Sequence, residues 1–386
     1  MDVLSTAQQL VAIDSVTSDS NADVTQRLSE WLTRLHFSVR CEAYTDAHGT
    51  RKQLLAARRD PPAGRPQTSG QTSQGGIAFF CHSDVVSVDG WNCPHAGPFD
   101  GTIAHDRLWG RGACDMKGPI AAALAAVARI EPQQQTAPIY FFVTGDEECG
   151  MLGAQLLSQH SPEYAQLVAE GGVGIIGEPT SLQVVNAHKG GCHIDVLSSG
   201  VAAHSSTSEG RNANWQLIPL LSFLEQLHHR SQTEPQFLNQ TFTPPTLSMN
   251  VVLENRPAAA NITVGQAVCR VFLRPMPDTA WEQLAEQIVQ RAEQLGLEVH
   301  MPPPLGPLVT PAASPLVQTA LKLAEQSQPV AVSYATDGCC FPQLTELIVI
   351  GPGDIAQAHR PDEWIAVEQL RRAVDIYLRL FRHYAT

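Results

Sequence analysis

Four short apolar segments from distant parts of this 386-residue chain are each followed by side chains that can bind metal ions. The segments are residues 77–81, 138–144, 173–176 and 347–350, and their composition is typical of buried β-strands. His82, the run Asp146-Glu147-Glu148 and Glu178 directly follow the first three segments, and His359 follows the fourth after a short loop. Polar groups often collect at strand ends, but that tendency does not predict two histidines and this many carboxylates. We therefore expect an α/β protein whose strands present these side chains at one edge of a sheet.

A fifth candidate ligand, Asp115, lies in a turn bounded by glycines, from Gly110 to Gly118. Pro119 and an alanine-rich run over residues 120–130 follow it, which predicts a helix. The strand–turn–helix pattern places Asp115 near the same sheet edge as His82.

The remaining patterns predict a separate domain inserted into the first. The segments before and after this insertion contain the spacing of helices over residues 3–13, 23–37, 152–159 and 367–384. They also contain predicted strands at residues 37–41 and 53–57. Residues 59–74 are rich in Pro, Gly, Ser and Thr and predict a mobile surface loop without chemistry. Residues 184–300 have the order β-α-β-β-α-β of a ferredoxin-like module. The expected domains are 1–183 (first catalytic part), 184–300 (insertion) and 301–386 (second catalytic part).

Composition excludes several classes of protein. A formal charge of −13 argues against a nucleic-acid surface, which needs clustered Lys and Arg. No apolar run reaches ~18 residues, so no membrane span is expected, and the N-terminal residues lack the basic start of a signal peptide. Nine cysteines without CxxC pairs favour reduced thiols in a cytoplasmic enzyme.

The donor set suits a pair of divalent ions better than a single ion. Asp115 could bridge the pair, with His82 and Glu178 on one ion, and Glu148 and His359 on the other. Zn²⁺ is the favoured ion because it accepts imidazole and carboxylate, and Co²⁺ or Mn²⁺ would also fit. Paired ions can lower the pKa of a shared water from ~15.7 towards ~7.

Two neighbours of these ligands have predicted roles in catalysis. Glu147 precedes Glu148 in the same turn, so one can ligate while the other faces the water as general base. Asp84, two residues after His82, could hold the second nitrogen of the imidazole.

The motifs together resemble those of the co-catalytic zinc amidohydrolases, over nearly the whole chain and in the same order. That family groups acetylornithine deacetylase, succinyl-diaminopimelate desuccinylase, aminoacylase and certain carboxypeptidases. The matching motifs are His82-Ser83-Asp84, Gly110 to Gly118, Asp146-Glu147-Glu148, Gly177 to Ser181 and Gln357-Ala358-His359. The resemblance implies the same ligands and the same base as above. Gly177 to Gln183, Ala187-His188-Lys189-Gly190 and the segment from Gly351 to Glu363 look most like the acetylornithine deacetylase branch.

The resemblance also implies roles for the inserted domain, as a lid that pairs two chains into a homodimer. His204 matches a family histidine that reaches the neighbouring subunit's site and steadies the oxyanion. Asn261 and Arg274 match residues that bind substrate, although the segment Asn261-Ile262-Thr263-Val264 lacks the proline that usually ends this family motif. Asp337-Gly338 resembles a loop beside the site, and a simple turn is an equally good interpretation.

The expected activity is hydrolysis of the N-acyl amide of a small amino acid, with N-acetyl-L-ornithine, a precursor of arginine, as the substrate. Succinyl-diaminopimelate, acetylcitrulline and dipeptides are alternatives. A relative that binds a metabolite without catalysis is a different class, and loss of a ligand or of Glu147 would favour it; all are present.

Overall fold

The computed structural model describes residues 1–62 and 75–386, and residues 63–74 of the predicted surface loop lie outside the described residues. Its largest sheet has the strand order β1-β2-β6-β3-β7-β15-β8-β13, with β14 paired to β8. The strands are β1 (Ser38–Thr45), β2 (Arg51–Arg59), β3 (Ile77–His82), β6 (Ile139–Thr144), β7 (Val173–Ile176), β8 (Val185–His188), β13 (Leu308–Val309), β14 (Val330–Val332) and β15 (Leu347–Val349). The four central strands β6, β3, β7 and β15 are parallel, so their carboxyl ends share one edge of the sheet.

The chain divides into two compact units. Unit 1 comprises Met1–Asn186, Thr310–Val330 and Thr336–Thr386, and unit 2 comprises Ala187–Val309 and Ala331–Ala335. The role of unit 2 as a lid and dimerisation domain stays a prediction.

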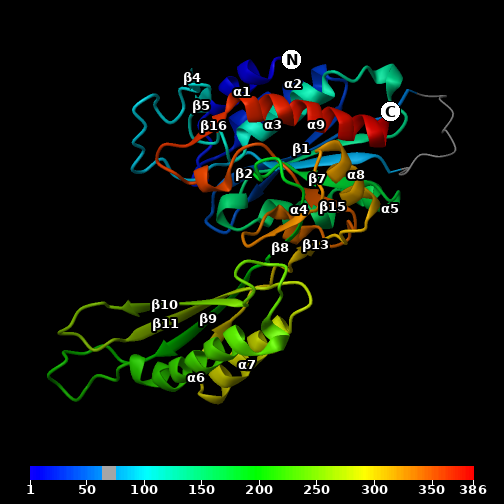
Figure 1. Ribbon diagram of the computed structural model, residues 1–386. Coiled ribbons are helices and arrows are strands. Elements are labelled where there is room, and N and C mark those ends of the chain that lie inside the picture. Colours follow the sequence, from blue (N-terminus) through cyan, green and yellow to red (C-terminus); the bar gives the residue numbers. More distant parts are fainter. Residues whose placement is uncertain (63–74) are drawn as a thin grey trace. The chain divides into compact units, whose positions relative to one another are not determined.

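Helices cover both faces of the central strands in unit 1, which explains why β3 and β6 are buried along their whole length (Figure 1). One face packs against a layer that contains α1 (Val3–Val11), α2 (Ala22–Arg34), α3 (Lys117–Val127) and α9 (Val367–Ala385). Every residue of α3 is buried, because α1 and α9 pack against it. On the opposite face lie α4 (Leu152–His160), α5 (Pro162–Ala169) and an aromatic cluster in which Phe80 contacts Phe142, Tyr164 and Phe341.

Two helices of unit 1 have no counterpart in the sequence prediction, α5 and α8 (Pro315–Leu323). Each begins with a serine whose side chain accepts an amide hydrogen of the first turn, Ser161 or Ser314, followed by proline. This Ser-Pro start is a recognised helix signal. The predicted helix at 23–37 ends earlier, at Arg34, because the chain turns into β1.

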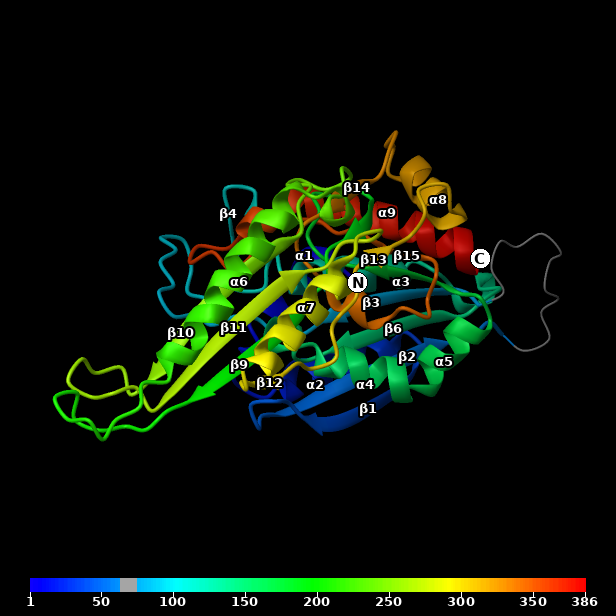
Figure 2. The ribbon, with the colours of Figure 1, turned by 90° about the horizontal axis from the view of Figure 1, so that it is seen from below.

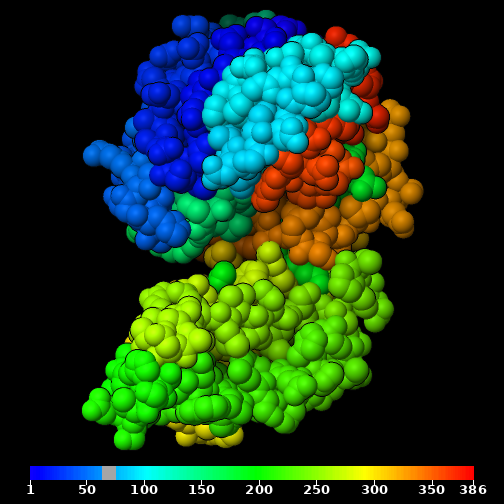
Figure 3. Space-filling model, turned by 90° about the vertical axis from the view of Figure 1, so that its left-hand side faces the viewer, coloured from blue at the N-terminus to red at the C-terminus, as the bar shows by residue number. Residues whose placement is uncertain are grey.

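A small three-stranded sheet joins two distant parts of unit 1. It contains β4 (Thr102–Ala104), β5 (Arg107–Trp109) and β16 (Trp364–Ala366), in the order β16-β5-β4. Figure 3 shows these segments side by side on one face, in cyan and orange-red.

Unit 2 has the element order and the strand order of a ferredoxin-like module. Its antiparallel sheet is ordered β10-β11-β9-β12, and α6 and α7 lie on the same face of it (Figure 2). The elements are β9 (Cys192–Ser199), α6 (Asn214–Thr233), β10 (Ser248–Arg256), β11 (Gln266–Arg274), α7 (Trp281–Gln294) and β12 (Glu298–His300). On β9, Ile194 and Val196 face the helices while His193 is exposed, which is the alternation expected of a half-buried strand.

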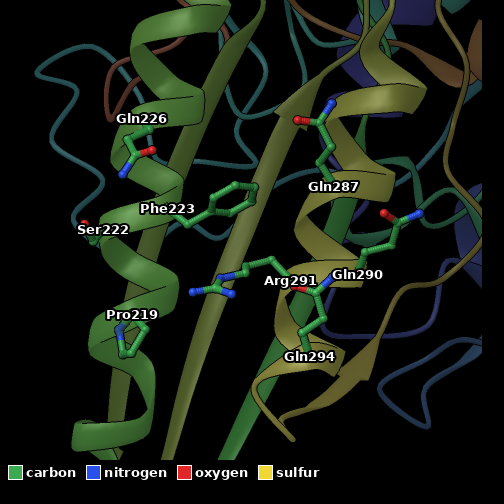
Figure 4. Close-up of a pocket in the computed structure, with 8 residues that line it drawn as sticks. All are labelled: Pro219, Ser222, Phe223, Gln226, Gln287, Gln290, Arg291 and Gln294. Carbon is green, nitrogen blue, oxygen red and sulfur yellow. The ribbon is translucent and has the colours of Figure 1, made fainter.

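A groove of about 710 Å³ separates α6 from α7 (Figure 4). Its lining consists mainly of polar side chains, among them Gln226, Gln287 and Arg291. None of the predicted site residues lines it.

Among the residues described, no helix combines the length and the apolar character needed to cross a bilayer. Short 3₁₀ helices complete the described structure: η1 (Pro132–Gln134), η2 (Glu147–Cys149), η3 (Pro235–Phe237), η4 (Asp337–Cys340) and η5 (Ile355–Gln357).

Candidate metal centre

The five predicted ligands converge at the carboxyl edge of the central strands. His82 Nε2 lies 3.0 Å from Oδ1 of Asp115 and 3.4 Å from Oε1 of Glu178. His359 Nε2 lies 3.0 Å from Oε2 of Glu148 and 3.7 Å from Oδ2 of Asp115. The two oxygens of Asp115 therefore face two different histidines, each of which also meets a second carboxylate.

The site carries more negative charge than its histidines balance. Burial, together with the charge of Asp115, raises the pKa of Glu178 to about 8, and burial also raises the pKa of Glu148. Burial alone would lower the pKa of His82, but Glu178 and Asp115 raise it well above its usual value. Crowded carboxylates of this kind are stabilised by a cation.

Two overlapping groups of donors could hold a metal ion, His82–Asp115–Glu148 and His82–Glu147–Glu178, with ligand atoms within 4.8 Å of one another in each group. In addition, Oε1 of Glu148 is buried without a hydrogen-bond partner among the described residues. Imidazole and carboxylate donors suit Zn²⁺, and an unpaired buried oxygen is what a ligand atom looks like without its ion. The residues present therefore fit a metal centre.

Asp84 connects the first histidine to the turn that carries Glu147 and Glu148. His82 Nδ1 lies 2.9 Å from the backbone oxygen of Asp84, closer than the 3.5 Å to its carboxylate. That carboxylate instead accepts the backbone amides of Glu147 at 3.3 Å and Glu148 at 3.2 Å. Burial opposes its ionisation, but the nearby charged ring of His82 and the amide of Glu148 outweigh burial and lower the pKa of Asp84.

The Glu147–Glu148 turn is fixed from its other side by Asp146. Oδ1 of Asp146 accepts hydrogen bonds from the hydroxyl of Tyr44 at 2.7 Å and from the amide of Gly153 at 2.8 Å. Burial raises the pKa of Glu147 well above its usual value, and the charge of Glu178 adds to the rise. A half-buried carboxyl held beside the ligands is suited to taking and returning a proton.

Asp337, for which a loop beside the site and a simple turn were equally good interpretations, is buried and contacts the last residue of β6. Its Oδ2 accepts a hydrogen bond from Thr144 Oγ1 at 2.6 Å, and its Oδ1 has no hydrogen-bond partner among the described residues. Burial raises its pKa to about 7. Nothing in the local sequence signals that this carboxyl is buried, because it depends on a contact across 193 residues of chain.

The remaining predicted residues lie in unit 2, in two separate places. His204 forms an isolated β-bridge with Ile262, and the amide of Ser205 donates to the oxygen of Asn261 at 3.0 Å, so His204 and Asn261 are neighbours. Arg274 ends β11, whereas Asn261 precedes its first residue, Gln266. The two ends of this nine-residue strand are about 26 Å apart at ~3.3 Å per residue.

Comparison with known proteins identifies the family of this chain. Residues 78–383 match the model for peptidase family M20/M25/M40. Among curated proteins, the acetylornithine deacetylase of Proteus mirabilis is 32% identical over 368 residues, which cover 92% of this chain and 88% of that protein. The acetylornithine deacetylase of Yersinia pseudotuberculosis is 30% identical over 388 residues, 97% of this chain and 93% of that protein.

Solved structures share the fold. The M20 family metallo-carboxypeptidase Sso-CP2 of Sulfolobus solfataricus superposes with a TM-score of 0.76 at 17% identity, covering 100% of this chain and 99% of that one. Human carnosine dipeptidase 1 superposes with a TM-score of 0.69 at 16% identity, over 99% and 96% of the two chains. At this level of identity the similarity establishes the fold and not the substrate.

Proposed function

This chain belongs to peptidase family M20/M25/M40, and from that premise we propose that it hydrolyses the amide of N-acetyl-L-ornithine to ornithine and acetate. It is a hydrolase with the full set of expected donors, and relatives named acetylornithine deacetylase align over nearly its whole length. The observation that most supports the proposal is the position of Asp115, whose two carboxylate oxygens face His82 and His359. Ornithine produced in this way would serve arginine biosynthesis in the cytoplasm, and nine free cysteines support that compartment.

On this proposal two divalent cations, with Zn²⁺ favoured over Co²⁺ or Mn²⁺, occupy the site. His82 and Glu178 would hold one cation, Glu148 and His359 would hold the other, and Asp115 would be a ligand shared by both. When bound, such a pair polarises the amide carbonyl and lowers the pKa of water. The ligand pairing is supported by the pairs His82–Glu178 and His359–Glu148, because each histidine also lies near one oxygen of Asp115.

Glu147 is the proposed general base. Its carboxylate would take a proton from the attacking water and return it to the nitrogen of the leaving amine, which balances the hydrolysis. Asp84 orients Glu147 and His82, because its carboxylate accepts the backbone amide of Glu147 and its backbone oxygen holds the ring of His82. Burial favours the protonated form of Glu147, which is the form that must donate to the amine.

Unit 2 is proposed to supply substrate contacts from two chains. His204 would steady the oxyanion, and Asn261 and Arg274 would bind the amino-acid part of the substrate. Because Asn261 and Arg274 flank opposite ends of β11, one copy of unit 2 cannot bring both to a molecule as small as acetylornithine. A homodimer, in which one chain provides Arg274 and its partner provides His204 and Asn261, would satisfy both contacts.

A comparison of substrates tests the proposal. The zinc-loaded protein should hydrolyse N-acetyl-L-ornithine with a higher kcat/KM than succinyl-diaminopimelate, acetylcitrulline or an unblocked dipeptide. A preference for the succinyl substrate or for the dipeptide would overturn the assignment of substrate while leaving the family intact. No hydrolysis of any amide would overturn the proposal that the site is catalytic.

A further inference from the structure

A buried carboxylate that the sequence interpretation gave no role, Glu363, holds the turn that carries Asp115. Its Oε1 accepts the backbone amides of Cys114 at 2.8 Å and Asp115 at 3.0 Å. Its Oε2 accepts the amide of Gly112 at 3.1 Å and Nη1 of Arg111 at 2.7 Å. Glu363 is completely buried, so these donors replace the water that a carboxylate would otherwise need.

Glu363 also belongs to the segment that carries the second histidine. It lies four residues after His359 and immediately before β16, where Trp364 pairs with Trp109 of β5. The backbone oxygen of Glu363 accepts the amide of Gly110 at 3.1 Å. Figure 3 shows the segment around β16 and the segment around β5 side by side on the surface, in orange-red and cyan. One side chain thus ties the Asp115 turn to the segment that follows His359, although 248 residues separate Glu363 from Asp115.

Arg111 extends the connection to a third segment. Its Nη2 donates to the backbone oxygen of Ser87 at 3.2 Å, and its guanidinium lies over the ring of Trp91 at 5.5 Å from the centroid. Ser87 belongs to the loop that leaves the strand ending in His82. Arg111 and Glu363 therefore connect the loop that follows His82 with the segments that contain Asp115 and His359.

The need for such a connection follows from the charge of the site. Asp115 lies with Glu148 and Glu178 near a single pair of histidines, and without a cation these carboxylates repel one another. The turn of Asp115 is irregular, with Gly110 and Gly112 at positive φ, so regular secondary structure does not fix it.

We propose that Glu363 is a positioning residue that holds Asp115 and His359 in their ligating arrangement before the cations bind. This inference rests on the proposed function, because it assumes that the five donors bind metal. A buried ion pair can also contribute to stability alone, so the test needs a measurement that distinguishes positioning from stability.

The matched pair of variants is Glu363→Gln and Glu368→Gln. Both make the same chemical change five residues apart, but Glu368 is exposed on the first turn of α9. In Glu363→Gln an amide nitrogen, which can only donate, must face some of the N–H donors that the carboxylate accepted. Calorimetric titration of the cation-free proteins with Co²⁺ should give affinity ~10- to 100-fold weaker for Glu363→Gln, the usual effect of losing a partner that orients a ligand. Glu368→Gln should bind as the wild type does.

Three outcomes separate the hypotheses. Equal Co²⁺ affinity in Glu363→Gln and the wild type, even with a lower melting temperature, would show that Glu363 contributes to stability alone and would overturn the inference. Failure of the wild type itself to bind Co²⁺ would overturn the proposed metal centre first. If Glu363→Gln does not fold, hydrogen exchange on cation-free wild type decides: the amides of Gly112, Cys114 and Asp115 should be protected, and rapid exchange at all three would contradict the proposal.

Discussion

The backbone amide of Glu148 donates to Oδ2 of Asp84 at 3.2 Å, across 64 residues of chain. Because Oδ1 of the same carboxylate accepts the amide of Glu147, Asp84 fixes the backbone from which both glutamates project. Two neighbours with the same side chain are thereby held in one rigid turn. Their different proposed roles can be separated by substitution.

Glu147→Gln should retain both cations but lose activity, since its carboxylate is proposed to handle only the proton of the water. We expect kcat to fall ~10²- to 10⁴-fold, with a smaller change in KM. Steady-state kinetics and metal analysis of the same sample measure both quantities. Loss of a cation from Glu147→Gln would mean that Glu147 is a ligand, as its proximity to His82 and Glu178 also permits.

Glu148→Gln is the complementary variant and should lose a cation and activity together. Its Oε2 lies 3.0 Å from His359 and its Oε1 has no hydrogen-bond partner among the described residues, so no other contact explains its burial. Elemental analysis should give two cations per chain for the wild type and close to one for this variant. A wild type that binds one cation tightly and gains nothing from a second equivalent would contradict the two halves of the site.

Mixed dimers test whether His204 acts on the partner's site. His204→Ala and Glu147→Ala should each be nearly inactive alone. Random mixing of the two should restore about a quarter of the wild-type sites, because heterodimers form half of the population and contain one intact site each. The control mixes a chain that carries both substitutions with the wild-type chain. Unmixed wild type is the reference for full activity. A molar mass of one chain in light scattering, or no recovery on mixing, would remove the basis for catalysis between subunits.

Asp337 gives a prediction about pH in the cation-free protein. Its folded-state pKa is about 7, above the ~3.9 of an unfolded chain, so the folded protein holds the extra proton between these values. The folded state therefore loses stability as pH rises from about 4 to 7, by up to ~1.4 kcal/mol per pH unit. In Asp337→Asn this loss should be absent while the hydrogen bond from Thr144 can remain. Urea unfolding in chelator at several pH values measures the difference, and parallel stability curves for the two proteins would contradict it.

The sequence predicted the central sheet and the βαββαβ module because their signals are local. Ile77–Cys81 and Phe141–Val143 are apolar on both faces, and the alternation of β9 is clear over Ile194 and Val196. The two missed helices, α5 and α8, also carried a local signal, the Ser-Pro start at Ser161 and Ser314. The three-stranded sheet of β4, β5 and β16 could not be predicted, since each strand has only three residues and β16 pairs with β5 across more than half the chain.

The same distinction holds for the site. The convergence of His82, Glu178 and His359 at one sheet edge could be predicted, because each residue follows an apolar strand segment. The position of a residue after such a segment indicates the edge of the sheet. Glu363 stands in the same motif as His359, but its role depends on amides near residue 112, and no local pattern encodes that contact. The nearer acceptor for His82 Nδ1 is likewise the backbone oxygen of Asp84, which residue identity alone does not reveal.

The central claim, a cation-dependent amidohydrolase that acts on acetylornithine, is tested most directly by ornithine release from the chelated wild-type protein before and after metal is returned. We predict no release above the uncatalysed rate in chelator and full release after about two equivalents of Zn²⁺ or Co²⁺ per chain. Release at the same rate in chelator, or none with Zn²⁺, Co²⁺ or Mn²⁺, would contradict the account.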